Sequence, residues 1–468
     1  MSTSKIIIVG GGLAGSEAAW QAARRGLTVE LHEMRPVRPT PVHQTSDLAE
    51  LVCSNSLKSN LLDTASGLLK EEMRRLDSLI VQVADRVKVP AGGALAVDRE
   101  AFARGVTDAI AAQPNIRLVR GEVTAIPDQG PCILATGPLA SDAIAAAIGA
   151  FTGTEYLYFF DAISPIIEAD TIDRSKVFGA SRYGKGGDDY LNCPMTEPEY
   201  DRFYQALIGA AEVPSHDFEK RPPAGGVLRP CGIAGAGDAV GAGDVPYFEG
   251  CLPIEEMARR GRETLLFGPM KPVGLVDPRT GRQPFGVVQL RQDTLAADFY
   301  SMVGFQNHLK FGEQTRIFRM IPGLEQAEFP RLGQVHRNSY INAPAVLLPT
   351  FQARRRRDLF FAGQISGVEG YLESAASGLI AGINAARLAD GGPAVIFPAT
   401  TALGALARYI SSSESANYQP TNIAFGLMPP LENDIRDKRR RKEAMVRRAL
   451  GDLEAFAAAQ LGTLVPAR

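Results

Sequence analysis

Short apolar runs separated by polar or glycine-rich breaks organise the first part of the chain. Residues 6–9 form a β-branched apolar run, the pattern of a strand buried on both faces. Residues 16–25 have the composition of a helix that stops at Gly26, and residues 27–31 form a second apolar run. This order predicts a strand, a helix and a second strand, as in an α/β nucleotide-binding fold.

A glycine pattern occupies the turn between the first strand and the helix. Gly10, Gly12 and Gly15 have GxGxxG spacing, in which the glycines permit a tight turn, close approach of a pyrophosphate and close helix packing. Glu33 follows the second run, about 20 residues beyond Gly12, where an acid binds the ribose hydroxyls of an adenine dinucleotide. The unit therefore predicts dinucleotide binding, and the alternative is a glycine-rich turn in another kind of α/β protein.

Further runs continue the α/β pattern and divide the chain. They predict helices at 98–112, with Asp98 as N-cap, and at 374–388, and strands at 116–126, 132–137 and 359–363. Residues from 152 onward mix short α and β patterns with many prolines. We therefore predict a Rossmann-like domain formed by 1–151 and 324–468, interrupted by an inserted α+β domain at 152–323. The second part ends in one or two basic helices between 432 and 460.

The composition and net charge of the chain limit how it could bind nucleic acid or a membrane. With 468 residues, 45% hydrophobic and 22% charged, the chain resembles an ordinary globular protein. Its net charge of −2 gives no overall attraction to nucleic acid, so a polyanion needs local patches such as 354–357 and 438–442. The N-terminus has no signal-peptide pattern and no long apolar run suggests a membrane span, so we expect a cytoplasmic protein without a membrane partner.

The cysteines differ in their surroundings. None of the five forms a CxxC pair, which predicts a reduced protein without a metal site. Cys132 lies in an apolar run and is expected in the core, whereas Cys53 lies in a polar loop and Cys251 follows Glu249 and Gly250. A cysteine in such a polar segment is more often reactive than structural. Cys193 and Cys231 match no motif and are interpreted as structural or incidental.

Segments along nearly the whole chain resemble the folate- and FAD-dependent tRNA (uracil-5-)-methyltransferases. They are GGGLAGSEAAW (10–20), HEMRP (32–36), ELVCSNSLKSN (50–60), VPAGGALAVDRE (89–100), YFEGCLPIEEMARRGRETLLFGPMKPVGL (247–275), VGFQNHLKFGEQTRIFRMIPGLE (303–325), VHRNSYINAP (335–344) and FAGQISGVEGYLESAASGLIAG (361–382). The resemblance implies a glutathione-reductase-type FAD-binding fold. It also implies methylenetetrahydrofolate as carbon donor, NADH or NADPH as reductant, and methylation of a T-loop uridine in tRNA to ribothymidine.

The resemblance also implies residue roles. Uracil C5 becomes nucleophilic when a thiolate adds to C6, and we assign Cys251 to that addition. Cys53 is then the general base for the C5 proton, or a thiol that guards the flavin adduct. The residues implied for FAD are Gly10, Gly11, Gly12, Leu13, Ala14, Gly15, Glu33, Gly363, Gln364, Glu369 and Gly370. His308, His336, Asn338 and Asn342 are candidates for the folate pocket, and Lys271, Lys310 and Arg316 for folate carboxylates or tRNA phosphates.

Three other functions stay open at this stage. A related flavoprotein aminomethylates a wobble uridine, but it has a longer chain with an extended C-terminal helical domain. A flavin-bearing RNA-binding protein without turnover would not need both Cys53 and Cys251. An NAD(P)H:flavin oxidoreductase would carry a second complete GxGxxG unit. The contiguous Ser215, His216 and Asp217 cannot form a catalytic triad, and the glycine-rich stretch 225–243 is interpreted as a surface loop. Oligomeric state and the choice between NADH and NADPH stay undetermined.

Overall fold

The computed structural model of the chain describes residues 5–40, 42–128, 130–153, 157–213, 252–415, 418–433 and 435–462. The predictions for Cys231, Cys251, the 215–217 segment and the 225–243 stretch lie outside these residues.

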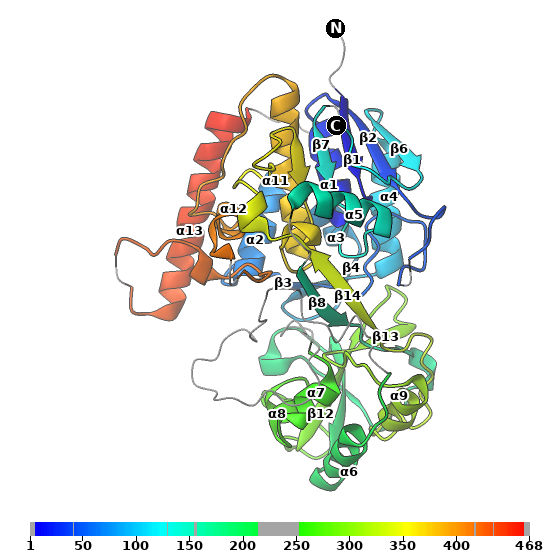
Figure 1. Cartoon of the computed structure of the whole chain (residues 1–468). Helices are drawn as coiled ribbons and strands as arrows, with labels where there is room; N and C mark the ends of the chain where they lie inside the picture. Colours follow the sequence, from blue (N-terminus) through cyan, green and yellow to red (C-terminus); the bar gives the residue numbers. More distant parts are fainter. Residues whose placement is uncertain are drawn as a thin grey trace.

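A five-stranded parallel sheet forms the centre of the larger body (Figure 1). Its order is β15-β7-β1-β2-β6. The strands are β1 (Lys5–Val9), β2 (Thr28–Glu33), β6 (Ile116–Arg120), β7 (Cys132–Leu134) and β15 (Leu359–Phe361). Since β15 pairs with β7 in parallel across more than 200 residues of sequence, the early and late parts of the chain build one sheet, as the Rossmann-like prediction requires. The fold class is confirmed.

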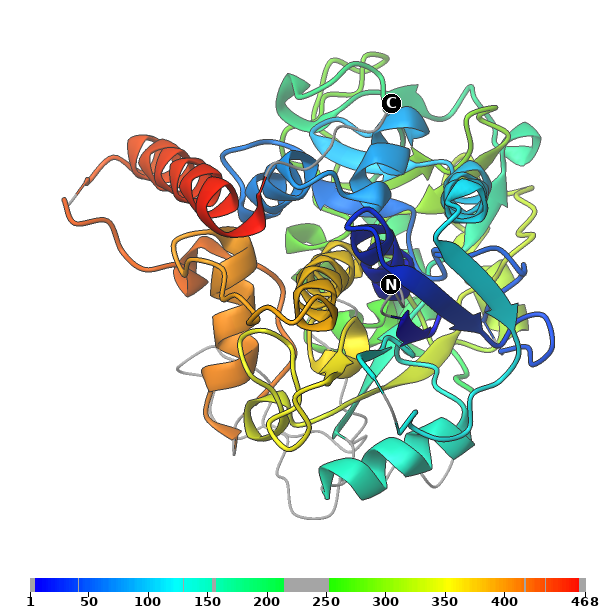
Figure 2. The ribbon, with the colours of Figure 1, turned by 90° about the horizontal axis from the view of Figure 1, so that it is seen from above.

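Two long helices pack on this sheet through small residues. Helix α1 (Leu13–Ala23) follows the glycine turn, and α11 (Tyr371–Ala389) follows β15; the two lie side by side (Figure 2). A β-carbon on Gly378 would lie 2.2 Å from the carbonyl oxygen of Ala14, and one on Gly382 would lie 2.6 Å from that of Ala18. Glycine on α11 therefore allows the backbones of the two helices to touch.

A small three-stranded sheet and four further helices complete this part of the larger body. A small sheet has the order β3-β5-β4, formed by β3 (Ser56–Ser59), β4 (Lys88–Val89) and β5 (Ala94–Val97). The helices around it and the parallel sheet are α2 (Ala65–Arg75), α3 (Leu79–Arg86), α4 (Arg99–Ala112) and α5 (Asp142–Thr152). Asp98 caps α4 as predicted, because its side chain accepts a hydrogen bond from Ala101 N at 2.9 Å.

The described residues between α5 and Tyr340 build a second body, below the first in Figure 1. An antiparallel pair, β8 (Leu157–Ala162) and β14 (Val335–Tyr340), connects the two bodies. The second sheet has the order β10-β11-β12-β13-β9, with β9 (Ile166–Glu168), β10 (Phe178–Gly179), β11 (Tyr190–Met195), β12 (Gly286–Gln292) and β13 (Phe299–Met302). The helices are α6 (Glu197–Ile208), α7 (Ile254–Arg259), α8 (Thr264–Phe267) and α9 (Phe311–Phe318).

Each body has its own hydrophobic core, and the residues in each core indicate where one domain ends and the other begins. Leu324 and Ala327 are fully buried in the core of the second body, together with Ile167 and Phe305. The boundary predicted at 323/324 would separate them from that core. We therefore propose that the inserted domain extends to β14.

The C-terminal region adds helices to the first body. They are α10 (Ala343–Val346), α12 (Ala402–Ser412) and α13 (Lys438–Phe456), which continues into a π-helical turn at Ala457–Leu461. One basic helix thus occupies the tail where one or two were predicted. Helix α13 lies at the left of the molecule in Figure 1, beside α12.

Several predicted boundaries are wrong by a few residues. Helix α1 begins at Leu13 and α11 at Tyr371, each three residues earlier than predicted. Strand β6 ends at Arg120, not 126, since pairing with β2 ends where Glu33 ends that strand.

Candidate active site

A cavity runs along the carboxyl ends of the parallel strands. It encloses about 1150 Å³, part of it open to solvent, and is lined by the segments that follow β1, β2, β6, β7 and β15. Ligands of open parallel sheets bind at this edge. Seven of the predicted cofactor residues line it: Gly10, Gly12, Leu13, Ala14, Glu33, Gly363 and Gln364.

The glycine turn fits a pyrophosphate. A β-carbon on Gly10 would lie 2.2 Å from the carbonyl oxygen of Ala135, so only glycine lets β1 approach the end of β7. A β-carbon on Gly12 would meet no atom within 4 Å, which leaves open space at the N-terminus of α1. The free N–H groups and the dipole of a helix N-terminus favour an anion in such a space.

The remaining predicted cofactor residues support the cavity from behind. A β-carbon on Gly15 would lie 1.8 Å from the carbonyl oxygen of Gly10, and one on Gly11 would lie 2.5 Å from the Leu48 side chain. Glu369 accepts a hydrogen bond from Gln364 Nε2 at 2.7 Å, and Gly370 is the N-cap of α11 with φ 107°. These four position the lining residues instead of forming the wall.

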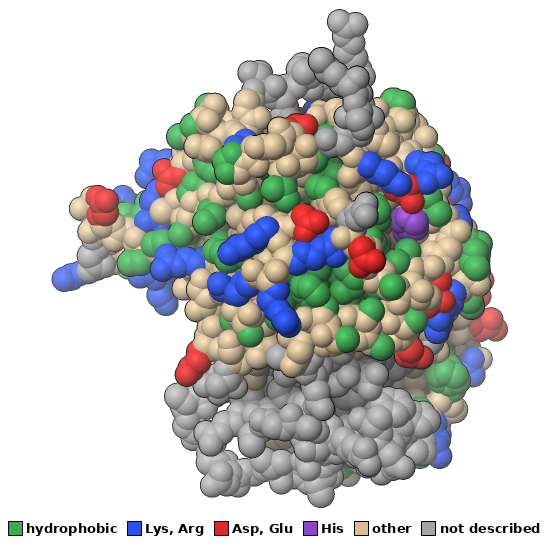
Figure 3. Space-filling model, turned by 45° about the horizontal axis from the view of Figure 1, so that its top comes forward, with side chains coloured by type: hydrophobic (Ala, Val, Ile, Leu, Met, Phe, Trp, Pro, Cys, Tyr) green, Lys and Arg blue, Asp and Glu red, His purple; other side chains and the backbone are tan. Residues whose placement is uncertain are grey.

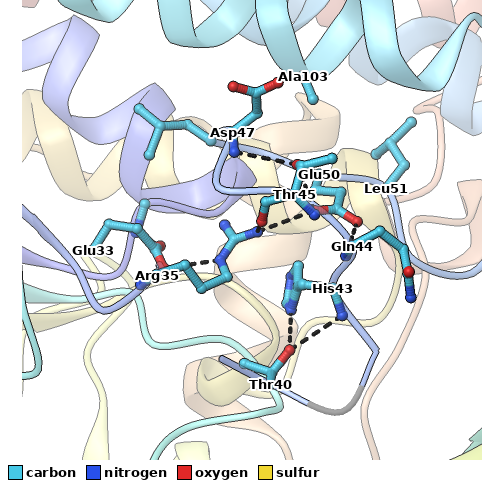
Figure 4. A network of polar contacts seen from close by, with 12 residues as sticks. Glu33, Arg35, Thr40, His43, Gln44, Thr45, Asp47, Glu50, Leu51 and Ala103 are labelled. Atoms are coloured by element: carbon cyan, nitrogen blue, oxygen red, sulfur yellow. Dashed lines mark hydrogen bonds and ion pairs between the residues drawn. The ribbon is translucent and has the colours of Figure 1, made fainter. Parts of the chain in front are cut away.

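Glu33 lies in a preformed polar network (Figure 4). Its carboxylate accepts hydrogen bonds from Gly11 N, Arg35 N and Arg35 Nε, each at 2.9 Å. Arg35 also contacts Glu50 at 3.2 Å, which fixes the loop after β2. Although burial opposes ionisation, the Arg35 guanidinium and these donors hold the pKa of Glu33 below its usual value. The carboxylate is therefore charged and oriented, and about one of its roughly four lone-pair sites is left for a ribose hydroxyl.

Cys53 lies on the wall of the same cavity, at the end nearest α11. Its backbone N–H donates to the hydroxyl of Tyr371 at 2.6 Å, and the thiol is half-buried. Tyr371 stays neutral because burial raises its pKa well above the usual value. The polar loop predicted around Cys53 is thus anchored to the first residue of α11.

Three arginines surround the Cys53 loop, two of them from the second body. Arg99 donates to Leu51 O at 3.0 Å, Arg331 to Val52 O at 2.7 Å, and Arg291 to Ser54 Oγ at 2.8 Å. Burial lowers the pKa of Arg291 and of Arg331. Nearby positive charge favours the thiolate form of a cysteine. Tyr371 and these arginines were missed from the sequence, because nothing local marks a partner that folding brings from so far along the chain.

The other cysteines behave differently. Cys132 on β7 is fully buried, and burial raises the pKa of its thiol to about 12, so its predicted place in the core is confirmed. Cys193 on β11 is also fully buried, and burial raises its pKa further. Neither thiol is suited to act as a nucleophile.

The segment that follows Cys251 is described from Leu252 onward. Ile254 N donates to Gln306 O at 2.8 Å, and Glu255 accepts from His308 N at 2.6 Å. Burial raises the pKa of Glu255 to about 7. These bonds join the segment after Cys251 to the His308 segment.

The residues predicted to bind folate or phosphate differ in burial and in their polar partners. Asn338 is fully buried, and among the residues that the structure describes neither end of its amide has a hydrogen-bond partner. Arg316 is exposed but paired with Glu313 at 2.7 Å, whereas Lys310 is exposed at the start of α9. His336 has no described side chain.

The two basic patches have different places. Residues 354–357 precede β15, so they lie at the amino ends of the parallel strands, opposite the cavity, and Arg355 and Arg356 donate to the carbonyls of Phe151 and Pro127. The patch at 438–442 is the first turn of α13, where Lys438, Arg440 and Arg441 are exposed. In the face shown in Figure 3, Lys and Arg side chains lie at the left edge, in the middle and at the upper right.

Neither a membrane span nor a metal site is found in the described part of the chain. No helix there is long and apolar enough to cross a bilayer, and no group of His, Cys, Asp and Glu residues there is arranged to hold a metal ion.

Comparison with known proteins identifies the family. The model of the family "Glucose inhibited division protein A" matches residues 5–235 and 241–393. The methylenetetrahydrofolate–tRNA-(uracil-5-)-methyltransferase TrmFO of Halalkalibacterium halodurans is 55% identical over 456 residues, covering 97% of this chain and 99% of the relative. That of Enterococcus faecalis is 55% identical over 453 residues, with 97% and 98% coverage. The solved structure of Aquifex aeolicus GidA has the same fold, with a TM-score of 0.68, 15% identity, and coverage of 97% of this chain and 73% of the GidA chain. This chain therefore belongs to the methylenetetrahydrofolate–tRNA-(uracil-5-)-methyltransferase family, within the wider glucose inhibited division protein A family.

Proposed function

We propose that this protein methylates C5 of the T-loop uridine in tRNA to give ribothymidine. The carbon donor is methylenetetrahydrofolate, the bound cofactor is FAD, and NADH or NADPH is the reductant. The observation that carries the proposal is the 55% identity along 97% of the chain with methyltransferases of that name. The reaction takes place in the cytoplasm, where folate, tRNA and reduced nicotinamide nucleotide meet.

The cavity has the parts that FAD needs. The turn from Gly10 to Ala14 and the N-terminus of α1 hold the pyrophosphate, and Glu33 takes the ribose. Gly363, Gln364 and the start of α11 face the flavin end, where Cys53 lies. Bound FAD supplies a carrier for the one-carbon unit and the two electrons that convert it to a methyl group.

The two cysteines divide the protein's part of the chemistry. The Cys251 thiolate adds to uracil C6, which makes C5 nucleophilic, and it leaves C6 again when the one-carbon unit on C5 is reduced to a methyl group and the ring double bond is restored. Cys53 removes the C5 proton after carbon transfer, as the general base. Arg331 donates to Val52, the residue before Cys53. Two residues further along, Gly333 lies against Asn307, whose chain neighbours Gln306 and His308 bond to the segment after Cys251. These contacts support a short path between the Cys53 loop and that segment.

The wobble-uridine alternative has less support. This chain covers 99% of the length of the named methyltransferase but 73% of the longer Aquifex GidA chain. A flavin-bearing protein without turnover would not explain why three arginines bind the loop that holds Cys53 on the cavity wall.

The cysteine roles can be tested by trapping. When tRNA carries 5-fluorouridine at the target position, the fluorine cannot leave as a proton does, so a covalent adduct persists. We expect the adduct with Cys53→Ala and none with Cys251→Ser, because a serine hydroxyl is too basic to supply the anion. Cys132→Ala, which empties a core position, is the control that keeps the adduct at some cost in stability.

Either of two results would change the proposal. Adduct formation with Cys251→Ser but not with Cys53→Ala would exchange the roles of the two thiols. Adduct formation in a double variant that lacks both thiols would end the covalent mechanism. Both variants should keep the flavin absorption of the wild-type protein, which checks that the fold is intact.

A further inference from the structure

An exposed tyrosine is held in a strained conformation on the second body. Tyr183 lies in the 3-10 turn Arg182–Gly184 with φ 57° and ψ 24°, the left-handed region. Its residue is 59% exposed. A bulky residue in this region is unfavourable and persists where the surroundings fix it, often at a functional site.

Two anchors fix this turn. Tyr183 N donates to Gly274 O at 3.0 Å, and the tyrosine ring lies against Gly274, where a β-carbon would be 2.8 Å from Cε1. Arg182 Nε donates to Gln289 Oε1 at 2.8 Å, and Arg182 Nη1 donates to the carbonyls of Lys271 and Val273. The glycine therefore supports the ring from below, and the arginine ties the turn to β12.

The anchored turn lies beside the Cys53 loop. Gln289 and Arg291 are two residues apart on β12, so they lie on one face of the sheet about 7 Å apart. Gln289 holds Arg182, and Arg291 holds Ser54 and Asn55, at 2.8 and 2.7 Å. One strand face thus positions both the exposed ring and the loop that carries Cys53.

The surroundings of the ring suit a nucleic acid. Lys185 is exposed and Lys271 half-buried, and among the described residues neither ammonium group has a carboxylate partner. Val273 and Val276 add exposed apolar surface. Asp188 is an exposed acid in the same loop, while Asp189 is occupied by Gly92 N at 2.6 Å. An aromatic ring flanked by cations is typical of surfaces that bind unpaired nucleotides.

We infer that Tyr183 is a platform on which an unpaired nucleobase of the tRNA substrate stacks, with Lys185 and Lys271 facing the adjoining phosphates. The inference rests on the proposed function and adds a substrate-positioning residue to it. A target uridine must leave its stack to reach a cysteine, and the neighbouring bases then lose a stacking partner. A fixed aromatic ring beside the Cys53 loop replaces that partner.

The first test measures tRNA binding and turnover with the full-length FAD-loaded protein. Tyr183→Ala should weaken tRNA binding about tenfold and raise the KM for tRNA, while kcat and the KM for folate stay near wild type. Tyr183→Phe should restore binding, since stacking needs only the ring. Ile396→Ala, which removes a 60% exposed apolar side chain near the far end of α11, is the matched control without effect.

Salt dependence separates stacking from charge. Tyr183→Ala should leave the slope of log affinity against log salt unchanged, whereas Lys185→Ala should reduce it by about one unit. Tyr183→Trp should give fluorescence that tRNA quenches; the wild-type protein, with its single Trp20, is the blank. If Tyr183→Ala binds tRNA as tightly as wild type, or tRNA leaves the Tyr183→Trp signal unchanged, the inference is wrong although wild-type methylation stands. A wild-type protein that does not methylate tRNA would overturn the proposed function instead.

Discussion

At the scale of single residues, cofactor recognition depends most directly on the Glu33 carboxylate. Three N–H donors and the Arg35 guanidinium orient it before any ligand binds. Its lowered pKa keeps it charged across the physiological range. The ribose hydroxyls of FAD would therefore meet an acceptor that needs no rearrangement, which reduces the cost of ordering on binding.

Replacing Glu33 with alanine should weaken FAD binding by about 1–3 kcal/mol, because the ribose loses a charged acceptor. The measurement is titration of the apoprotein with FAD, followed by flavin fluorescence. Glu30→Ala is the control, since Glu30 is three residues earlier on β2, points to the other face, and pairs with Lys5. Equal FAD affinity of Glu33→Ala and wild type would show that the ribose lies elsewhere.

Residue-level prediction of position succeeded where the surroundings are local in sequence: the glycine turn directly precedes α1 and Cys132 lies in the core. The GxGxxG turn and Cys132 were assigned from neighbouring residues, and the resemblance added Cys53. Tyr371 was missed because it is 318 residues from Cys53 in sequence. Arg291 and Arg331 were missed for the same reason: an arginine in a strand or loop looks like a solvated charge until folding brings it to a partner.

At the scale of elements, the predicted order of strands and helices held while several ends moved. The pairs β1–β2 and β1–β7 were predictable because buried parallel strands give continuous apolar runs. The contact between α1 and α11 was not, since it depends on where Gly378 and Gly382 face Ala14 and Ala18. Small residues carry little periodicity, so the sequence cannot show which helix they approach.

A buried carboxylate between two helices gives a pH-dependent prediction. Glu72 on α2 accepts hydrogen bonds from Ala402 N and Leu403 N at the start of α12, at 2.7 and 2.9 Å. Burial raises its pKa from 4.5 to about 8. As the pH rises, the Glu72 side chain therefore loses its proton at a lower pH in the unfolded state than in the folded state. The free energy of unfolding consequently falls as the pH rises from about 4.5 to about 8.

The comparison with Glu72→Gln isolates this effect. Between pH 5 and 8, the free energy of unfolding of the wild-type protein should fall by up to about 1.4 kcal/mol per pH unit relative to that of the glutamine variant, whose side chain cannot ionise. Denaturant unfolding at several pH values measures the difference. A constant difference across this range would show that Glu72 stays ionised, held by the two N–H groups and the α12 dipole.

At the scale of the whole molecule, the site forms where the two bodies meet. The FAD-binding body supplies the cavity and Cys53, and the second body supplies Arg291 and Arg331, which bind the Cys53 loop. The sequence predicted an insertion but not this junction, because few sequence signals describe how one domain rests on another. With a net charge of −2, tRNA binding must depend on local basic patches.

The basic first turn of α13 should contribute to tRNA binding. Neutralising Arg440 and Arg441 together should weaken binding and reduce the salt slope by about one unit for each tRNA phosphate that the variant no longer neutralises. Arg354 and Arg355 form the control pair, because they lie opposite the cavity and donate to carbonyls of the protein. If the slope stays unchanged in the α13 variant, the tRNA must bind to another face.

The origin of the methyl carbon tests the central claim most directly. The protein is incubated with unmodified tRNA, NADPH, and methylenetetrahydrofolate carrying deuterium on its methylene carbon; the nucleosides are then analysed by mass spectrometry. We predict ribothymidine at the T-loop position that keeps both deuterium atoms, with no label when deuterated S-adenosylmethionine replaces the folate. Ribothymidine labelled from S-adenosylmethionine, or no ribothymidine from an FAD-loaded protein with all substrates present, would contradict the account.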